Sequence, residues 1–420
     1  FLHSEPLKDV FSRSLTGWLR RQDRQSPTPR TRTDQNMTEA QEIDVYRYFR
    51  HLRKNDPVSR MDDGTWQVAR YDDALAVLRD PRTFSADVST RPPEERGSPS
   101  MLFSDAPLHN RLRKLVSYAF KPAHIEAQRD MITARCNELV TAMRDESHVE
   151  LVDAFAAPLP VTVIADMLGV ADGDMRQFKQ WSDAIFSNIG DILFDSPSDS
   201  AQQAGAEMNA YFLDRIADIR RQPQDHVLGR LVIAETEDGH LTDEEILSFC
   251  ALLLIAGNET TTGLITAAAR VFDKYPQTFQ QLQGDHSVIP TFIEEALRDY
   301  SPFSVTARRA TRDTLIGDTA IAAGDLVLPM LSSANRDESV FHRADEFVID
   351  RDPNPHLAFG FGVHFCLGAH LARLEGEIAV KSLLKQFQGI SLAAPCHGAE
   401  SMLGGPSELQ VELHRIQTHC

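Results

Sequence analysis

The sequence contains one helical pattern long enough to cross an entire domain. It opens in the segment HLTDEEIL, where Thr242 is a plausible N-cap and Glu245, three residues later, completes a capping box. The pattern continues to Lys274, just before Pro276, so the helix would be about 50 Å long at about 1.5 Å per residue. Its longest apolar run, residues 249–257, is shorter than the roughly 20 residues that a membrane span needs. We therefore expect this helix to cross the centre of a domain, and we expect no membrane span.

The middle of this helix departs from ordinary helix composition. It reads AGNETTTG, with two glycines and three consecutive threonines. Glycine costs roughly 1 kcal/mol relative to alanine in a helix interior, and threonine hydroxyls compete for backbone carbonyls. Such a local violation inside a long buried element indicates a functional site, although a simple kink would give the same pattern.

A second unusual stretch is FGFGVHFCLG, residues 359–368. It places Cys366 among three glycines and three phenylalanines. The glycines allow another body to approach the main chain closely, and the aromatic rings would exclude water from the sulfur. The five cysteines of the chain are scattered and contain no CxxC pair, which argues against a disulfide framework and a zinc site. The loop therefore suits either a buried inert thiol or a thiolate bound to a metal.

Composition restricts the partners and the compartment of this 420-residue chain. The net charge of −18 argues against nucleic acid as a partner, because contacts to phosphates need clustered Lys and Arg. Scattered cysteines fit a reducing compartment, and no signal peptide is visible, so we expect a cytoplasmic protein.

The first 36 residues differ from the rest. They carry seven Lys or Arg against four Asp or Glu, and we expect a basic N-terminal extension ahead of one domain that spans residues 37–420. The extension could be an amphipathic helix that lies on a membrane or docks a partner. A flexible appendage is the favoured interpretation, because one short helix without a hydrophobic anchor binds membranes weakly.

Helical patterns dominate the remaining sequence, with short strand signals between them. A hairpin around Asp-Asp-Gly is predicted by VSRMDDGTWQVAR, and a short helix by YDDALAVLRD. A helix is also predicted by PLHNRLRKLVSYAF, with an apolar stripe of Leu112, Leu115, Val116 and Ala119. Short strands are predicted by TLIGDTAIAAGDLVLPM. The expected fold is mainly α with a minor β component.

Three features in a fixed order resemble the cytochrome P450 family of haem-thiolate monooxygenases. The cysteine loop matches the bacterial pattern FGxGxHxCxG at every specified position, AGNET matches the long-helix motif AGx(D/E)T, and EALR matches ExxR. Further matches are HNRLR, ANRD and HLAFG. A coincidence of several ordered motifs is far rarer than a single match. The resemblance covers residues 37 to 420 and implies a cytochrome P450 fold in which the long helix crosses over a buried haem.

The resemblance also implies how haem b is held through its iron. Cys366 would be the axial thiolate ligand, whose electron donation favours O–O cleavage. Phe359 would shield the sulfur, while Gly360 and Gly368 would let the loop pack beneath the porphyrin and aim backbone N–H groups at the sulfur.

The two haem propionates need cationic partners when they are buried. By resemblance these partners are His109 and Arg113, one helical turn apart, together with Arg308 and His364. Because Arg309 is adjacent to Arg308, the choice between these two arginines stays open.

On the opposite face of the haem, the resemblance places the irregular part of the long helix. Ala256 and Gly257 would leave room for oxygen where the helix opens. Thr260 would accept a hydrogen bond beside the bound oxygen or hold a water there, and Glu259 would relay protons from solvent. The Glu259 carboxylate could instead only close a kink.

The ExxR motif has a structural interpretation. Glu295 and Arg298 are three residues apart and can pair on one helix face. The resemblance adds Arg351 to them and implies a folding role below the haem for this triad.

The resemblance implies an enzyme that inserts one oxygen atom of O2 into a hydrophobic small molecule, acting as a monomer. Electrons would come from NAD(P)H through ferredoxin reductase and ferredoxin, and Arg111, Lys114 and Arg373 could form an exposed docking patch for an acidic ferredoxin. The loops expected around the pocket carry no fixed charge pair, which suits a polyketide, terpenoid, steroid or fatty acid. The alternatives are a peroxygenase that uses H2O2 and a non-catalytic haem-binding scaffold; the intact Glu259–Thr260 pair argues against both.

Overall fold

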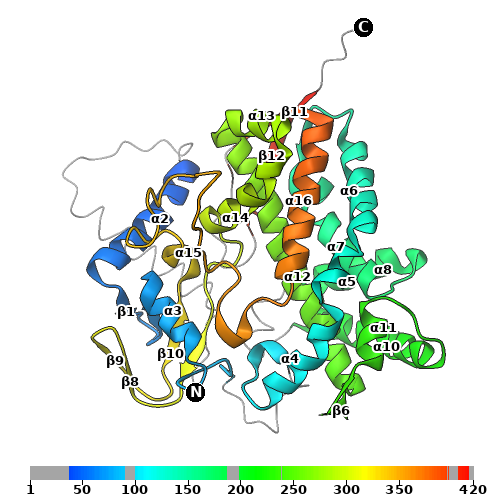
Figure 1. Cartoon of the computed structure of the whole chain (residues 1–420), viewed down its shortest axis with the longest axis horizontal. Helices are drawn as coiled ribbons and strands as arrows, with labels where there is room; N and C mark the ends of the chain where they lie inside the picture. The colour runs from blue at the N-terminus through cyan, green and yellow to red at the C-terminus, as the bar shows by residue number, and fades with distance from the viewer. Residues whose placement is uncertain are drawn as a thin grey trace.

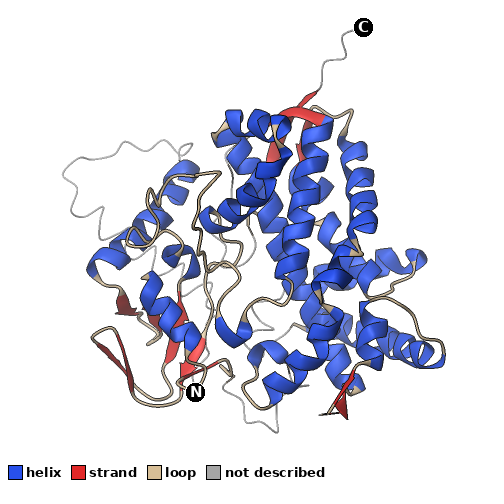
Figure 2. Cartoon of the chain, in the orientation of Figure 1, coloured by secondary structure: helices blue, strands red, loops and turns tan. Residues whose placement is uncertain are grey.

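Helices dominate the computed structural model, which describes residues 37–89, 100–186, 198–237, 239–394, 396 and 405–415. Figure 2 shows the helices filling one side of the molecule, with most strands on the other side or at the top edge. This arrangement confirms the predicted mainly α fold with a minor β component. The predicted basic extension, residues 1–36, lies outside the described residues.

The helices occupy most of the chain between the strands. They are α2 (Met37–Asn55), α3 (Tyr71–Arg79), α4 (Leu108–Ala119), α5 (Pro122–Glu126), α6 (Arg129–Met143), α7 (Pro158–Met167), α8 (Met175–Phe186), α10 (Asp199–Arg221), α11 (Val227–Ile233), α12 (Asp243–Lys274), α13 (Pro276–Gly284), α14 (Ile289–Asp299), α15 (Leu331–Ala334) and α16 (Ala369–Gln386). Shorter helical turns are η2 (Met101–Phe103), η3 (Val152–Ala156), η4 (Asp172–Asp174), η5 (His286–Val288) and η6 (Gly362–His364).

The strands form a five-stranded sheet, a three-stranded sheet and two hairpins within the described residues. The larger sheet has the order β1-β2-β10-β7-β3, with β10 parallel to β2 and antiparallel to β7. The smaller sheet has the order β11-β12-β4. Their bounds are β1 (Val58–Arg60), β2 (Trp66–Val68), β3 (Phe84–Ser85), β4 (His148–Glu150), β5 (Glu235–Thr236), β6 (Gly239–His240), β7 (Arg308–Ala310), β8 (Thr314–Ile316), β9 (Thr319–Ile321), β10 (Leu326–Pro329), β11 (Phe387–Leu392) and β12 (Gln410–Arg415).

The local predictions outside the long helix are confirmed. The segment around Asp-Asp-Gly forms the antiparallel pair β1–β2, and the next segment forms α3. The predicted apolar stripe of α4 is buried. The predicted short strands are β8, β9 and β10.

The helix at the centre of the fold is α12, and its predicted bounds are confirmed. The Thr242 side chain caps it by accepting a hydrogen bond from the Glu245 N–H at 3.2 Å, while the Glu245 carboxylate accepts one from the Thr242 N–H at 3.0 Å. The helix ends at Lys274 and packs against α7, α14 and α16 (Figure 1). By length and hydropathy alone α12 could cross a membrane, but 61% of its most apolar window is buried inside the protein. It is the core helix of the domain.

The unusual composition in the middle of α12 does not interrupt the helix. The hydroxyls of Thr260 and Thr262 donate hydrogen bonds to the carbonyls of Ala256 and Asn258, four residues earlier, at 2.8 and 2.9 Å. These bonds satisfy the hydroxyls within a continuous helix. The expectation that the helix opens at this point is therefore wrong.

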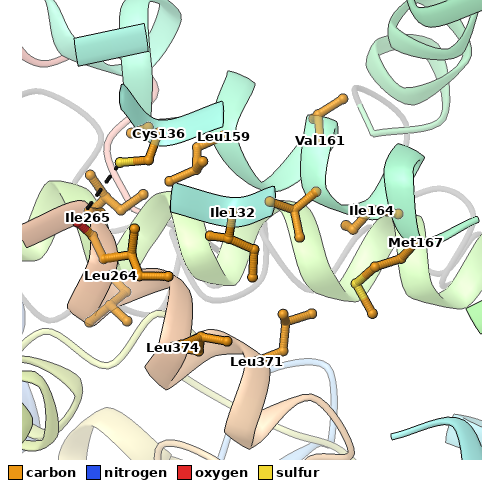
Figure 3. Close-up of a cluster of buried hydrophobic side chains, with 14 of the residues drawn as sticks. Ile132, Cys136, Leu159, Val161, Ile164, Met167, Leu264, Ile265, Leu371 and Leu374 are labelled. Atoms are coloured by element: carbon orange, nitrogen blue, oxygen red, sulfur yellow. Dashed lines mark hydrogen bonds between the residues drawn. The ribbon is translucent and has the colours of Figure 1, made fainter. Parts of the chain in front are cut away.

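The largest hydrophobic cluster joins α6, α7, α12 and α16. Figure 3 shows Ile132 of α6, Leu264 of α12 and Leu374 of α16 around one interior, and all three are buried. Cys136 lies in the same cluster and donates a long hydrogen bond of 3.9 Å to the Ile378 carbonyl. Burial raises the pKa of the Cys136 thiol to about 12, so this cysteine is an inert part of the core.

The carboxyl group of Glu375 is buried beside this cluster. Glu375 lies on α16 with a relative exposure of 1%, and its Oε2 atom has no hydrogen-bond partner among the described residues. Burial in apolar surroundings disfavours the charged form and raises the pKa of Glu375 to about 8. The side chain is therefore protonated in the folded protein at neutral pH.

We expect Glu375 to make the stability of the protein depend on pH. Above about pH 4.5 the unfolded chain releases this proton while the folded protein retains it up to about pH 8, so the free energy of unfolding falls across that window by at most about 5 kcal/mol. Glu375→Gln should remove this decline and raise the denaturant midpoint at pH 8 relative to the wild type. Denaturant unfolding of both proteins at pH 6, 7 and 8 measures the pH dependence of the free energy of unfolding.

The matched control is Glu377→Gln on the same helix. Glu377 is partly exposed and pairs with Lys381 at 3.4 Å, so its replacement should leave the pH dependence unchanged. Parallel pH profiles for wild type and Glu375→Gln would show that Glu375 does not carry a proton in the folded state.

Candidate functional site

The cysteine loop, residues 359–368, contains η6 and leads into α16. The Cys366 N–H donates to the Phe359 carbonyl at 2.9 Å and closes the loop. Gly360 and Gly362 have φ angles of +66° and +74°, and a Cβ on Gly362 would come within 2.8 Å of the Leu78 carbonyl of α3. Glycine is therefore required at position 362 by both its conformation and its contact with α3.

The Cys366 sulfur lies at the start of α16 and interacts with positive groups. Burial raises the pKa of this thiol, whereas the backbone N–H of Gly368 and the charges of Arg113 and Arg373 oppose the shift. A Cβ on Gly368 would contact the sulfur at 3.9 Å. The predicted N–H donor to the sulfur is thus present in the loop.

Basic side chains from three separate elements converge beside this loop. His109 of α4 and His364 of η6 have ring centroids 4.1 Å apart, and the Nε2 atoms of both are buried without a hydrogen-bond partner among the described residues. Arg308 of β7 is buried against them. Arg113 of α4 donates to the Phe365 carbonyl at 2.7 Å.

The electrostatics of this cluster favour an anion. Burial and the charges of Arg308, His109 and Arg113 lower the pKa of His364 to about 3, and burial lowers the pKa of Arg308 to about 10. Asp105 interacts electrostatically with Arg308 and His109, but its carboxylate already accepts hydrogen bonds from the Ser85 hydroxyl and the Ala86 N–H. Two unpartnered ring nitrogens beside buried cations fit the propionates of a haem.

Arg308 and Arg309 point to different surroundings. Arg309 donates to the carbonyls of Val88 and Gly324 at 2.6 and 2.9 Å. Arg308 is buried, donates to the Ala307 carbonyl at 2.7 Å, and interacts electrostatically with His109 and His364. The structure therefore brings Arg308, rather than Arg309, into the basic cluster.

One face of α12 stays accessible in the middle of an otherwise buried helix. Leu252, Ala256 and Thr260, spaced four residues apart, lie on one side and are partly or fully exposed, while Leu254 and Thr261 are buried. Glu259 is also partly exposed. Ala256, Thr260 and Glu259 therefore place small and polar side chains where the resemblance expects the oxygen site.

Gly257 makes a packing contact that the sequence did not reveal. A Cβ on Gly257 would come within 2.7 Å of the Ile164 Cδ1 atom of α7. The missing side chain allows α12 and α7 to pack closely.

The predicted ExxR triad forms as expected. Arg298 donates to both carboxylate oxygens of Glu295 at 2.7 and 2.8 Å, and both side chains are fully buried. Arg351 donates to the same carboxylate at 3.0 and 3.1 Å. Glu295 and Arg298 are thus part of the interior, and the Arg351 side chain is 7% exposed beside them.

Arg111, Lys114 and Arg373, the side chains predicted to form a basic docking patch, have acidic partners that the sequence did not reveal. Each of these side chains forms an ion pair within the chain: Arg111 with Glu245, Lys114 with Glu237 at 2.7 Å, and Arg373 with Glu294 at 2.7 Å. Sequence reasoning treated α4 and α16 as isolated helices and therefore missed acidic partners from other elements.

Sequence reasoning also missed Glu294 and His356. Both contact the side chains around the cysteine loop. The signals were present, since Glu294 precedes the ExxR glutamate and His356 opens HLAFG. The loops expected to line the substrate pocket lie partly outside the described residues.

Comparisons with known proteins agree with this geometry. A model of the cytochrome P450 family matches residues 44–394. The chain is 37% identical to the putative cytochrome P450 YjiB of Bacillus subtilis, over 87% of this chain and 93% of that protein. It is 34% identical to the steroid C26-monooxygenase of Mycolicibacterium smegmatis, over 86% of this chain and 91% of that protein.

A solved structure shows the same fold. CYP109E1 of Bacillus megaterium in complex with testosterone has a TM-score of 0.80 and 34% identity, over 87% of this chain and 98% of that one. The family model and these relatives cover most of the chain. The chain therefore belongs to the cytochrome P450 family, whose members are monooxygenases that carry haem b on an axial cysteine thiolate.

Proposed function

We propose that this protein inserts one oxygen atom of O2 into a bulky apolar molecule, with Cys366 as the thiolate ligand of the haem iron. The observation that carries this proposal is the His109–His364 ring pair at the cysteine loop, in which both Nε2 atoms are buried and unpartnered among the described residues. A haem whose propionates reach this pair would lie between the Cys366 loop and the accessible face of α12.

The residues around the loop hold the cofactor and tune its ligand. The haem, when bound, supplies the activation of O2 by two electrons. The Gly368 N–H donates to the Cys366 sulfur and stabilises the thiolate. His109, Arg308 and His364 offer donors to the propionates.

Thr260 and Glu259 of α12 deliver protons on the side of the haem opposite Cys366. The Thr260 hydroxyl donates its hydrogen to the Ala256 carbonyl at 2.8 Å, so its oxygen is left to accept a hydrogen bond from a water or a protonated group. Glu259 lies one residue earlier, partly exposed, and relays protons from solvent towards that position.

The substrate is proposed to be bulky and hydrophobic. Two relatives support a steroid as the first class to test: the steroid C26-monooxygenase and the structure bound to testosterone. Polyketides, terpenoids and fatty acids share the same apolar character and belong in the same screen. A shift of the Soret band on titration identifies the compounds that reach the haem.

Electrons are proposed to come from NAD(P)H through ferredoxin reductase and ferredoxin, with the protein acting as a monomer in the cytoplasm. Phe361, Val363 and Phe365 alternate along the cysteine loop and are all exposed, and the cation of Arg79 lies 4.9 Å from the Phe361 ring centroid. A ferredoxin docking here would depend on apolar contacts more than on the ion-paired side chains of α4. Equally fast product formation with H2O2 alone would favour the peroxygenase alternative.

The role of the basic cluster is tested by haem retention. Arg308→Gln should release haem to an apomyoglobin acceptor about tenfold faster or more, because a charge-assisted hydrogen bond to a propionate is lost. Arg309→Gln is the matched control and should match the wild type, because the Arg309 side chain donates to the carbonyls of Val88 and Gly324. Equal release rates for Arg308→Gln and Arg309→Gln would place the propionates elsewhere.

The proton-delivery role is tested by the coupling of electron use to product. Thr260→Ala should keep haem and substrate binding but lower the product formed per NAD(P)H by about threefold or more, with the electrons diverted to peroxide. Thr260→Ser keeps the hydroxyl and should retain most of the coupling. If Thr260→Ala couples as well as the wild type, Thr260 only completes the hydrogen bonding of α12.

A further inference from the structure

Three side chains behind the cysteine loop form a connected network. Glu294 of α14 accepts hydrogen bonds from the Nε and Nη2 atoms of Arg373, on α16, both at 2.7 Å. His356 donates from Nε2 to the same carboxylate at 3.2 Å, and its Nδ1 accepts from the Ala358 N–H at 3.3 Å. The His356 side chain is only 3% exposed, whereas Glu294 and Arg373 are about one-third exposed.

The network holds one aromatic ring of the cysteine loop. The Arg373 guanidinium carbon lies 4.5 Å from the centroid of the Phe359 ring, and the His356 ring centroid lies 6.0 Å from it. The Phe359 carbonyl in turn accepts the hydrogen bond from the Cys366 N–H at 2.9 Å. Arg373 is thereby fixed one side chain away from the segment that carries the sulfur.

The charges of this network persist across the working range of pH. Burial opposes ionisation of Glu294, but hydrogen bonds and charge from Arg373 and His356 outweigh it and hold the pKa of Glu294 at about 2. Arg373 and Cys366 also interact electrostatically. A permanent cation therefore stands close to the sulfur, partly compensated by the Glu294 carboxylate.

The guanidinium of Arg373 is held by contacts within the chain. Its guanidinium makes two hydrogen bonds to one carboxylate and stacks on a ring, so its orientation is set from within the chain. A forked pair of this kind fixes a charge more closely than a single contact does. Such fixation matters for a charge that acts on a nearby redox centre.

We propose that Arg373, held on the Phe359 ring by Glu294 and His356, is a positioning residue that raises the reduction potential of the Cys366-bound haem iron. Reduction adds one electron from the redox partner to the iron and lowers the total charge at the site by one. A fixed cation stabilises the reduced form relative to the oxidised form, and the carboxylate of Glu294 limits this effect. The inference rests on the proposed role of Cys366 as the iron ligand.

The test measures the ferric–ferrous equilibrium of the purified holoprotein by spectroelectrochemistry. Arg373→Gln should disfavour the ferrous form by about threefold to tenfold, because one nearby positive charge is lost. Glu294→Gln should shift the equilibrium in the opposite direction, because the cation is no longer compensated. Arg373→Lys keeps the charge without the forked geometry and should fall between Arg373→Gln and the wild type.

The matched control is Lys381→Gln. Lys381 pairs with Glu377 at 3.4 Å on the same helix, and the eight-residue separation from Arg373 corresponds to about 12 Å along the helix axis. Removing this charge should change the equilibrium much less than Arg373→Gln does.

The outcomes separate this inference from the ligand assignment. Equal ferric–ferrous equilibria for wild type and Arg373→Gln, with the thiolate-type CO spectrum intact, overturn the inference alone. Absence of that CO spectrum in the unaltered protein overturns the ligand assignment and the inference with it. If Arg373→Gln does not retain haem, Glu294→Gln decides: a shift towards the ferrous form supports the proposal, and no shift contradicts it.

Discussion

A fully buried ion pair, Glu295 with Arg298, anchors the segment that leads into the cysteine loop. Burying two charges is costly unless their hydrogen bonds are complete, and here Arg298 also donates to the carbonyls of Asn335, Ala344 and Glu346 at 2.9 to 3.0 Å. The arginine thereby ties α14 to three points of the chain between α15 and the loop. The position of the loop depends on this pair.

The remaining site residues come from elements far apart in sequence. α4 supplies His109 and Arg113, β7 supplies Arg308, and η6 supplies His364. A cluster of buried basic groups destabilises a protein unless an anion joins it. The haem propionates of the proposed function would supply this anion beside the cysteine loop.

The sequence predicted what depends on local pattern and ordered motifs. The bounds of α12 followed from Thr242, Glu245 and Pro276, and the pairing of Glu295 with Arg298 followed from their spacing. The same local reasoning missed the packing role of Gly257, because the side chain that its missing Cβ would meet is Ile164, on another helix.

Charge neutralisation was beyond local reasoning for the same reason. The acid partners of Arg111 and Arg373 are Glu245 and Glu294, more than 70 residues away. A pattern of basic residues on one helix does not reveal acids that folding brings to it. Glu375 belongs to the same class, since only the packing of α16 shows that its carboxyl is buried.

The central claim is that Cys366 is the thiolate ligand of the haem iron. The direct measurement is the absorption spectrum of the reduced, CO-bound protein, compared with Cys366→Ser. An oxygen ligand does not supply thiolate donation, so the red-shifted Soret band should disappear in Cys366→Ser and persist in Cys136→Ser and Cys250→Ser, whose thiols are buried in α6 and α12. An unchanged red-shifted band in Cys366→Ser would contradict the account.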